Sequence, residues 1–479
     1  MNQFGYLASS LTLSERADAQ TAVVEYVREA RQRGFAIDGM HLSSGYCQDE
    51  GSGERQYFHW NRHRYPEPRT LGQLLEGQEA CQLIINVKPW LLETHPSFAS
   101  VASSGGFVRA ALDAIEPDVD PDRCGAHGNS RTWHWSTAMG QTGRGSFFDF
   151  SSRAGIAKWK QLLKSGVLAN AITGVWIDNN EMSTLIDDGE RVAGEESVYA
   201  GNCASSSHSL EVSQRMSGWS GITEVGTWGR AALTMGMARA THQALLEADP
   251  DRRPVIVTRS AVPGMSAFAS GTWSGDNSTT WAAMEWSTRL TLSYGLSFGI
   301  GLYGHDIGGF AGAHSPSAEL LLRWCQQAAW HTRFTVHSWK EISTTLWMYD
   351  EDVTEQLRRI VDWRYRLVPM LYSVYVTDWY RKGWPILRPL LWHHSKDRNT
   401  LTQDAQFLLG SHILVAPVLR KNHTSVRFNL PLVVGEDAEP TWWCDWSSGQ
   451  WYGPDGDHIG RTLLLRELRC FTYSREERD

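Results

Sequence analysis

Three segments of this chain carry an acidic residue at, or in the loop beyond, a point where a strand is expected to end. Asp178 closes the run Ile172–Ile177 in the segment GVWIDNNEM, and Asp306 closes the segment GLYGHD together with His305. Asp276 is expected in a Gly- and Trp-rich loop that follows the strand ending at Arg259 and could place this residue against a substrate. In parallel barrels of strands and helices, catalytic groups come from the carboxyl ends of several strands. These acids are therefore the first candidates for chemistry, although a strand-end aspartate can also cap a helix or bind a loop.

Asp178 and Asp276 suit the two parts that hydrolysis of a glycosidic bond requires. One carboxylate attacks or directs water, and the other carboxyl group protonates the departing oxygen. The attacking group must stay ionised, and Arg259 is the nearest expected positive neighbour. Burial against Trp273 and a nearby negative charge would raise the pKa of the acid, Asp276. Glu181 follows Asp178 closely, and we interpret it as an anchor of the loop rather than as an attacking group.

The elements that must position these residues alternate between short apolar strands and longer amphipathic helices. Helices are expected at Ala19–Arg33, Ala231–Ala248 and Val353–Trp379. Strands are expected at Phe4–Leu7, Phe35–Leu42, Leu83–Val87, Ile172–Ile177, Val255–Thr258 and Gly299–Tyr303. This alternation predicts an α/β fold with a parallel sheet. The number of strand–helix units and the length of the chain favour an eight-stranded (β/α)8 TIM barrel over residues 1–384 rather than a doubly wound sheet.

Two stretches interrupt the barrel pattern, and a third region follows it. Residues 91–146 and 185–228 are rich in Gly, Ser and polar residues and are too long for ordinary loops, so we predict insertions that shape the substrate pocket. From about Pro385 the chain changes to short strands with turn residues, which predicts a C-terminal β-sandwich over residues 385–479.

Composition excludes several classes of protein. The formal charge of -8 over 479 residues comes without a basic stripe, so nucleic acid is not an expected partner. No run of about 18 apolar residues could span a membrane, and no signal peptide is recognisable, so we expect a cytoplasmic chain. The 23 tryptophans favour carbohydrate only weakly, because large barrels bury many of them as core. The oligomeric state stays open.

The ordered segments GVWIDNNE, RSA followed by TWSGDN, and GHDIGGF resemble the signatures of glycoside hydrolase family 31, the α-glucosidase and α-xylosidase family. FGYLASS, FAIDGMHL, FHWNRHRYPEP, WRYRLVPMLYSVY, ILRPL and FLLGSHILVAPV extend the resemblance over nearly the whole chain. A lone DIGG would be weak, whereas this ordered set is very specific.

The resemblance implies a retaining exo-acting α-glycosidase that works by double displacement, without metal or organic cofactor, on an oligosaccharide or glycoside. It implies that Asp178 is the nucleophile and Asp276 the acid/base, with carboxyl groups about 5 to 5.5 Å apart as retention requires. The positions that match the family's contacts to the terminal sugar are Arg259, Trp273, Asp306 and His337, and Trp176 lines the same pocket.

Departures from the family pattern keep alternatives open. Ser43 and Ser44 stand where most α-glucosidases of the family have acids that bind the 4-hydroxyl, which puts a preference for ordinary α-glucose in doubt. Thr335 replaces an arginine, and the HLSSGY and RFTVHS runs resemble a branch with α-glucosyl-transferring members. A transglycosylase is therefore one alternative, and a catalytically silent relative is another. The family's N-terminal β-sandwich is absent before Phe4, so either Met1 is an internal start of a truncated chain or this branch lacks that domain. Compared with the family's full set of C-terminal sandwiches, the β-rich end at residues 385–479 is short, so we expect that sandwich to be incomplete.

Overall fold

The structure is a computed structural model that describes part of the 479-residue chain. The described residues are 2–110, 124–137, 141–182, 214–216, 223–224, 230–423, 425–431, 442–446, 449–452, 462–464 and 470–474. The chain divides into two compact units. Unit 1 comprises Met1–Ala8, Ala30–Asp38 and Trp273–Asp479, and unit 2 comprises Ser9–Glu29 and Gly39–Thr272.

Eight strands form the sheet that confirms the predicted barrel class. They are β1 (Tyr6–Ser10), β2 (Gly39–Leu42), β3 (Gln82–Val87), β8 (Gly174–Ile177), β11 (Ile256–Thr258), β12 (Gly271–Trp273), β13 (Leu302–Gly304) and β14 (Phe334–Ser338). Their order in the sheet is β13-β12-β11-β8-β3-β2-β1-β14. Within unit 2, parallel registers such as Met40↔Leu83, Ile85↔Val175 and Val257↔Trp176 join neighbouring strands. Nearly every strand residue is buried, as expected for a parallel sheet covered on both faces.

Two barrel strands, β12 and β14, were not predicted from the sequence. The residues of β12 were expected in a loop, because a three-residue strand flanked by Gly and Ser carries no alternating pattern. The strand β14 holds His337 and was not predicted as a strand. The expected strand at Phe35–Leu42 is shorter in the structure and begins at Gly39. Short strands buried on all sides are held by their neighbours, so local sequence marks their ends poorly.

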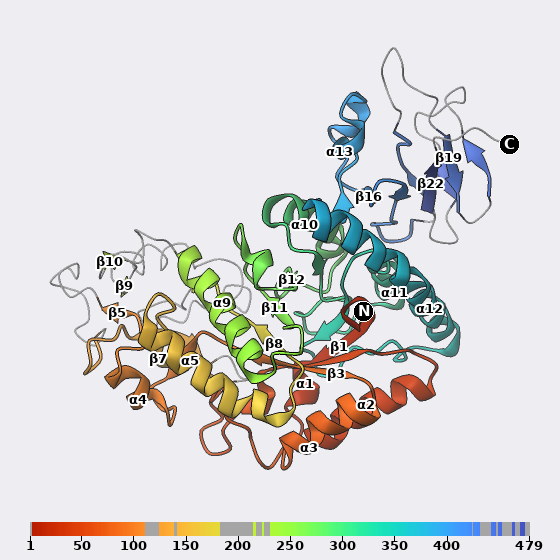
Figure 1. The fold of residues 1–479 in the computed structure, drawn as a ribbon. Coiled ribbons are helices and arrows are strands. Elements are labelled where there is room, and N and C mark those ends of the chain that lie inside the picture. The colour runs from red at the N-terminus through yellow and green to blue at the C-terminus, as the bar shows by residue number, and fades with distance from the viewer. Residues whose placement is uncertain are drawn as a thin grey trace. The chain divides into compact units, whose positions relative to one another are not determined.

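Helices separate the strands as the sequence predicted. They are α1 (Leu11–Ser14), α2 (Ala19–Gln32), α3 (Pro68–Gln73), α4 (Phe98–Ser103), α5 (Arg153–Gly166), α9 (Arg230–Ala248), α10 (Trp281–Phe298), α11 (Ala318–Ala328), α12 (Glu351–Val374) and α13 (Leu391–His394). Side-chain caps start several of them: Ser152 accepts from Gly155 N at 3.1 Å, and Thr280 accepts from Ala283 N at 3.1 Å. In unit 2, α5 packs against α9 (Figure 1). Among the described residues, no helix combines the length and apolarity needed to cross a membrane.

The first predicted insertion contains small antiparallel sheets. The strands of its larger sheet are β4 (Trp90–Leu92), β6 (Thr132–Trp135) and β7 (Thr142–Phe147), in the order β4-β7-β6. A second sheet joins β5 (Arg109–Ala110) to β9 (Gln214–Met216) and β10 (Thr223–Glu224). Apart from these last two strands, the predicted insertion at 185–228 lies outside the described residues.

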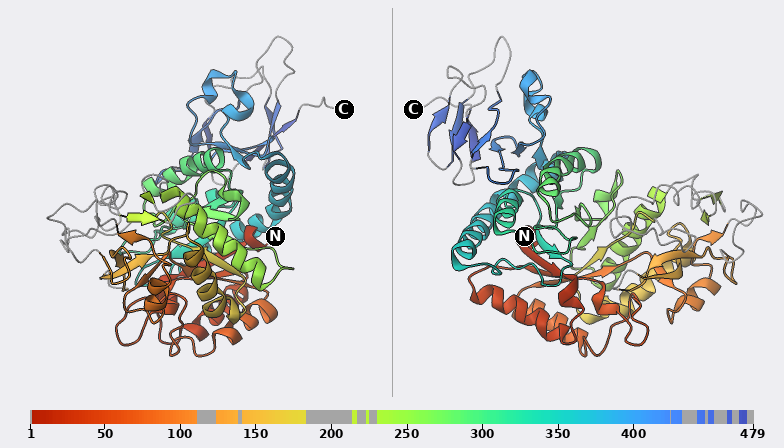
Figure 2. Two further views of the ribbon diagram at one scale, coloured as in Figure 1. Left: turned by 60° about the vertical axis from the view of Figure 1, so that its left-hand side comes forward. Right: turned by 180° about the vertical axis from the view of Figure 1, so that it is seen from behind.

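The C-terminal region forms antiparallel sheets within unit 1. The larger has the order β15-β16-β17-β22-β19-β20, and the smaller pairs β18 with β21. Their bounds are β15 (Leu387–Arg388), β16 (Phe407–Leu409), β17 (Ile413–Val415), β18 (Ser425–Arg427), β19 (Trp442–Asp445), β20 (Trp451–Tyr452), β21 (Thr462–Leu464) and β22 (Cys470–Ser474). One apolar cluster joins Leu292 of α10 and Leu371 of α12 to Phe407 of β16 and Val415 of β17. The sheet accordingly lies beside α10 and α12 in Figure 1 and Figure 2.

Candidate active site

Asp178 lies directly after β8 and is 8% exposed, and its carboxylate is bound on both oxygens. Oδ2 accepts from Asn86 Nδ2 at 3.2 Å and from the ammonium group of Lys88. Oδ1 accepts from the backbone N–H of Asn179 at 2.7 Å and forms an ion pair with Arg259 Nη1 at 3.3 Å. An ionised carboxylate accepts about four hydrogen bonds, so these donors fill its capacity. Three strand ends, those of β3, β8 and β11, supply the five residues.

The two cations decide the protonation state of Asp178. Burial raises the pKa of this carboxyl, but the charges of Lys88 and Arg259 and the donated hydrogen bonds outweigh it, so the pKa lies well below its usual range. Asp178 is therefore a buried carboxylate that stays ionised. The prediction that Arg259 is its positive neighbour is confirmed.

Lys88 was missed by the sequence analysis. It follows the buried run of β3 directly and is 4% exposed, with its ammonium group 5.7 Å from the ring centroids of both Trp90 and Trp135. The same rule that singled out strand-end acids would have found it, because it occupies the corresponding place after an apolar strand. A strand-end lysine carries no signature of its own for this chemistry, because hydrolysis of a glycosidic bond requires carboxyl groups.

Glu181 anchors the loop that follows Asp178, as the sequence analysis predicted. Its carboxylate binds the guanidinium of Arg259, with Nε at 3.3 Å from Oε2, and accepts from Ser260 Oγ at 3.1 Å. Arg259 thus spans two carboxylates and ties the loop to the end of β11. Asn179 and Met182 adopt left-handed backbone conformations with φ of 50° and 55°, which turn the chain sharply after Asp178.

Trp176 and the two serines mark further parts of unit 2 near the strand ends. Trp176 is 5% exposed, and because side chains of a strand alternate, it faces the same side as Asp178. Ser43 and Ser44 are buried, and Ser44 Oγ accepts from Arg55 Nε at 2.8 Å. Arg55 is buried as well and is paired with a glutamate, Glu15, at 2.7 Å. The Ser44 hydroxyl is therefore already engaged within the protein.

Trp273 and Asp276 belong to unit 1, at the end of β12 and in the loop after it. Trp273 is 2% exposed, whereas Asp276 is half-buried. Gly275 stands between them with φ of +80°, a conformation that favours glycine and turns the loop. The sequence prediction of a loop position for Asp276 is confirmed, and the strand before this loop, β12, is one of the two that were not predicted.

Asp306 and His337 lie at the ends of β13 and β14, and backbone pairing brings these two ends together. Asp306 forms a parallel bridge with Thr335, and the N–H of Ile307 donates to Thr335 O at 2.9 Å. The side chains of Asp306 and His337 are buried. Arg333 is a buried cation facing Asp306 that the sequence analysis did not identify. Burial lowers its pKa to about 10, although the charge of Asp306 acts in the opposite direction.

His305 stands beside Asp306 in sequence but is held in the core of unit 1. Its Nδ1 lies 2.9 Å from Ser274 Oγ and its Nε2 lies 2.8 Å from Thr291 Oγ1. Burial lowers its pKa well below the usual value. A neutral imidazole with both nitrogens engaged by hydroxyls has a structural role.

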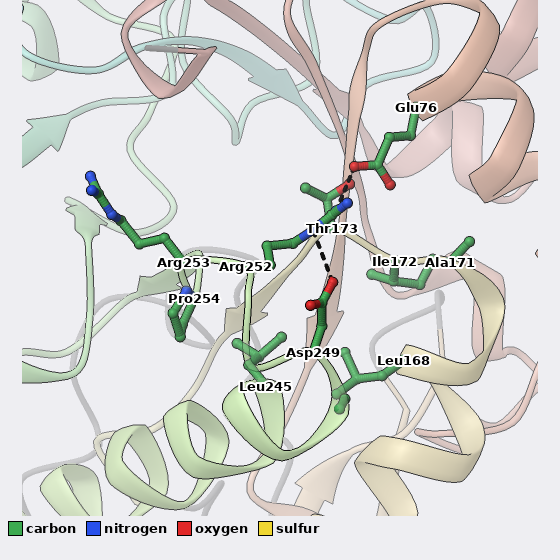
Figure 3. A pocket seen from close by; sticks show the side chains of 11 residues that line it. Glu76, Leu168, Ala171, Ile172, Thr173, Leu245, Asp249, Arg252, Arg253 and Pro254 are labelled. Atoms are coloured by element: carbon green, nitrogen blue, oxygen red, sulfur yellow. Dashed lines mark hydrogen bonds and ion pairs between the residues drawn. The ribbon is translucent and has the colours of Figure 1, made fainter.

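A pocket in unit 2 lies at the amino ends of β8 and β11, away from the carboxyl ends that Asp178 and Arg259 follow (Figure 3). It is lined by Thr173, which precedes β8, and by Pro254, which precedes β11. The guanidinium of Arg252 crosses it, pairing with Glu76 at 2.5 Å and Asp249 at 3.4 Å. Asp178 and Arg259 follow the other ends of the same two strands. Because barrels place catalytic groups at the carboxyl ends, this pocket belongs to the face that contributes stability.

Comparison with known proteins identifies the family pattern over most of the chain. Residues 2–374 match the family model described as the glycosyl hydrolases family 31 TIM-barrel domain, and residues 383–471 match the glycosyl hydrolase family 31 C-terminal domain. A probable alpha-glucosidase of Oryza sativa subsp. japonica is 32% identical over 309 residues, which cover 62% of this chain and 33% of that protein. The alpha-glucosidase of Hordeum vulgare is 30% identical over 334 residues, covering 69% of this chain and 36% of that protein. The chain thus spans about a third of the length of these two relatives.

Solved structures share the fold. A GH31 alpha-xylosidase from a soil metagenome, complexed with xylose, has a TM-score of 0.77 at 20% identity, covering 98% of this chain and 63% of that chain. The GH31 dextranase of Flavobacterium johnsoniae, complexed with glucose, has a TM-score of 0.78 at 19% identity, covering 98% of this chain and 51% of that chain. At this level of identity the likeness concerns the fold alone.

Proposed function

This chain belongs to glycoside hydrolase family 31, and we propose that it is a retaining, exo-acting α-glycosidase that hydrolyses the terminal α-linked sugar of an oligosaccharide or glycoside. The observation that carries the proposal is the Asp178 carboxylate, which is buried at a strand end and kept ionised by Lys88 and Arg259. A buried carboxylate that stays charged is ready to attack an anomeric carbon without first losing a proton.

In the proposed reaction, Asp178 attacks the anomeric carbon and Asp276 donates its proton to the leaving oxygen. The glycosidic bond breaks as an ester bond to Asp178 forms. Asp276, now ionised, then takes a proton from water, whose oxygen attacks the anomeric carbon and releases Asp178. Two inversions give net retention. The first step is assisted by a high pKa of the acid and the second by a low one, so the same carboxyl group serves both.

The remaining residues would bind the terminal sugar. We assign the hydroxyl contacts to Arg259, Asp306 and His337, and the apolar contacts to the buried rings of Trp176 and Trp273. Charged groups make the stronger hydrogen bonds to hydroxyls, so Asp306 and Arg259 would contribute most to orientation. Ser44 is already engaged by Arg55, which supports the expectation that recognition differs from the acid-dependent contact of most α-glucosidases.

The proposal is tested by assaying the purified chain on 4-nitrophenyl α-glucoside, α-xyloside and α-galactoside, beside its Asp178→Asn variant. We expect release of nitrophenol from one of these sugars and a loss of at least about a thousandfold in the variant, because the amide is not a nucleophile. Asp249→Asn is the matched control, since Asp249 lies on the surface at the opposite strand ends. A folded chain that releases no nitrophenol from any substrate would contradict the proposal.

Transfer to an acceptor sugar is measured in the same assay by adding maltose. In the proposed hydrolase, water resolves the intermediate and the free sugar accumulates in proportion to nitrophenol. Lengthened oligosaccharides as the main product would instead identify a transglycosylase.

A further inference from the structure

Lys340 is a buried lysine of unit 1 that joins three loops. It lies just after β14 and is 5% exposed. Its ammonium group donates to Thr279 Oγ1 at 2.6 Å and reaches the backbone carbonyl oxygens of Phe310, Ala311 and Gly312 at 3.2, 3.3 and 3.4 Å. One cation thus holds a hydroxyl from the loop after β12 and three carbonyls from the loop after β13.

Each of these three loops follows a strand and carries a residue of the proposed site. Thr279 stands in the loop of Asp276, the turn at residues 310–312 follows Asp306, and Lys340 itself follows His337. Backbone hydrogen bonds connect the same loops. Phe310 N donates to Asn277 O at 2.9 Å, Thr279 N to Ala311 O at 3.0 Å, and Trp339 N to Phe310 O at 3.1 Å.

Burying the ammonium group of Lys340 costs desolvation free energy that simple filling of space would not require. Burial of its ammonium group lowers the pKa to about 8, so the surrounding dipoles do not fully offset the loss of hydration. A methionine of similar length would fill the position without a charge to desolvate. What an apolar chain cannot supply is several directed hydrogen bonds that fix Thr279 against residues 310–312.

We propose that Lys340 is a positioning residue for Asp276, which holds the loop 274–280 so that the carboxyl group of Asp276 is aimed at the leaving oxygen. This inference rests on the proposed function of Asp276 as the acid. Misplacing a catalytic group by about 1 Å costs on the order of a hundredfold in rate. Loss of the lysine contacts would therefore weaken acid catalysis while Asp178, in unit 2, keeps its own cations.

The test compares Lys340→Met on two substrates of the sugar that the nitrophenyl screen identifies. The first is the methyl α-glycoside, whose departing oxygen needs a proton, and the second is the α-glycosyl fluoride, whose leaving group depends little on the acid. We measure kcat/KM, because it reports the step that breaks the glycosidic bond. The ratio of kcat/KM for the methyl glycoside to kcat/KM for the glycosyl fluoride should fall about tenfold or more in Lys340→Met. The fall of the same ratio in Asp276→Asn gives the effect of losing the acid altogether. Lys396→Met, at an exposed lysine of the same unit, should leave the ratio unchanged.

A second variant keeps the test decisive if Lys340→Met does not fold. Thr279→Val removes the hydroxyl that Lys340 binds and leaves the lysine in place, and it should shift the ratio in the same direction by a smaller factor. Equal loss on both substrates, in a chain whose unsubstituted form is active, would overturn this inference and leave the proposed function standing. No turnover of either substrate by the unsubstituted chain would overturn the proposed function and the inference with it.

Discussion

At the scale of single residues, two lysines distinguish this site from the arrangement expected from its acids alone. Lys88 shares the Asp178 carboxylate with Arg259, whose guanidinium is also bound to Glu181. Lys340 acts on backbone and hydroxyl oxygens rather than on a carboxylate. A lysine is a point charge on a long flexible stem, so it can reach a buried oxygen from the end of a neighbouring strand.

Replacement of Lys88 by methionine is expected to raise the pKa of Asp178. Without the Lys88 ammonium group, Arg259 is the remaining ion-pair partner of Asp178 among the residues that the structure describes. Burial continues to favour the protonated carboxyl group. The acid limb of the kcat/KM profile should therefore move to higher pH by about one unit. The measurement is the pH dependence of kcat/KM on the preferred nitrophenyl glycoside.

The matched control for this prediction is Lys158→Met on the surface of α5, where the ammonium group contacts Ser100 Oγ at 2.8 Å. Its acid limb should coincide with that of the unsubstituted chain. If the limb of Lys88→Met stays in place as well, Lys88 does not set the charge of Asp178.

At the scale of elements, the loop after β13 depends on glycines that let it approach the loop after β12. Gly309 has φ of +84°, and a Cβ atom there would lie 2.5 Å from Thr279 Cα. Both the backbone conformation and the contact exclude a side chain. The same approach brings Thr279 and residues 310–312 close enough for Lys340 to bind both.

Gly309→Ala is expected to lower the free energy of unfolding by about 1–3 kcal/mol, the range for a non-glycine residue in a strained backbone conformation. Urea unfolding followed by circular dichroism measures this change. Gly77→Ala is the control, because a Cβ at Gly77 meets no atom within 4 Å and Gly77 lies in a helical turn, Leu74–Gln78, where alanine is favoured. Similar stabilities for the two variants would show that the two loops can separate at little cost.

At the scale of the whole molecule, one apolar cluster in unit 1 extends across the predicted boundary at residue 384. Leu371 of α12 and Leu292 of α10 share this cluster with Phe407 of β16, which is 1% exposed. The division into 1–384 and 385–479 stays a prediction. Apolar area buried in common makes the stabilities of the two parts depend on each other.

Phe407→Ala is expected to cost about 3–5 kcal/mol, the usual effect of removing a buried phenylalanine. Because the cluster includes barrel helices, the loss should lower the midpoint of thermal unfolding of the barrel, followed by the circular dichroism of its helices, and not only that of the C-terminal sheet. Leu401→Ala is the control, since Leu401 is 56% exposed and its truncation should change stability by less than about 0.5 kcal/mol. An unchanged barrel transition in Phe407→Ala would mean that the two regions unfold independently.

Sequence alone determined the α/β class, the helices at α2, α9 and α12, and the placement of Asp178 and Arg259 at strand ends. These features are local, because a buried parallel strand is a continuous apolar run and the first polar residue after it marks its end. The tertiary structure decided which strand ends supply partners. Lys88 and Asp178 lie on different strands joined by a long connection, and Lys340 meets Thr279 across two further strand ends. Such contacts depend on strand order and register, which a single sequence without strong alternation does not encode locally.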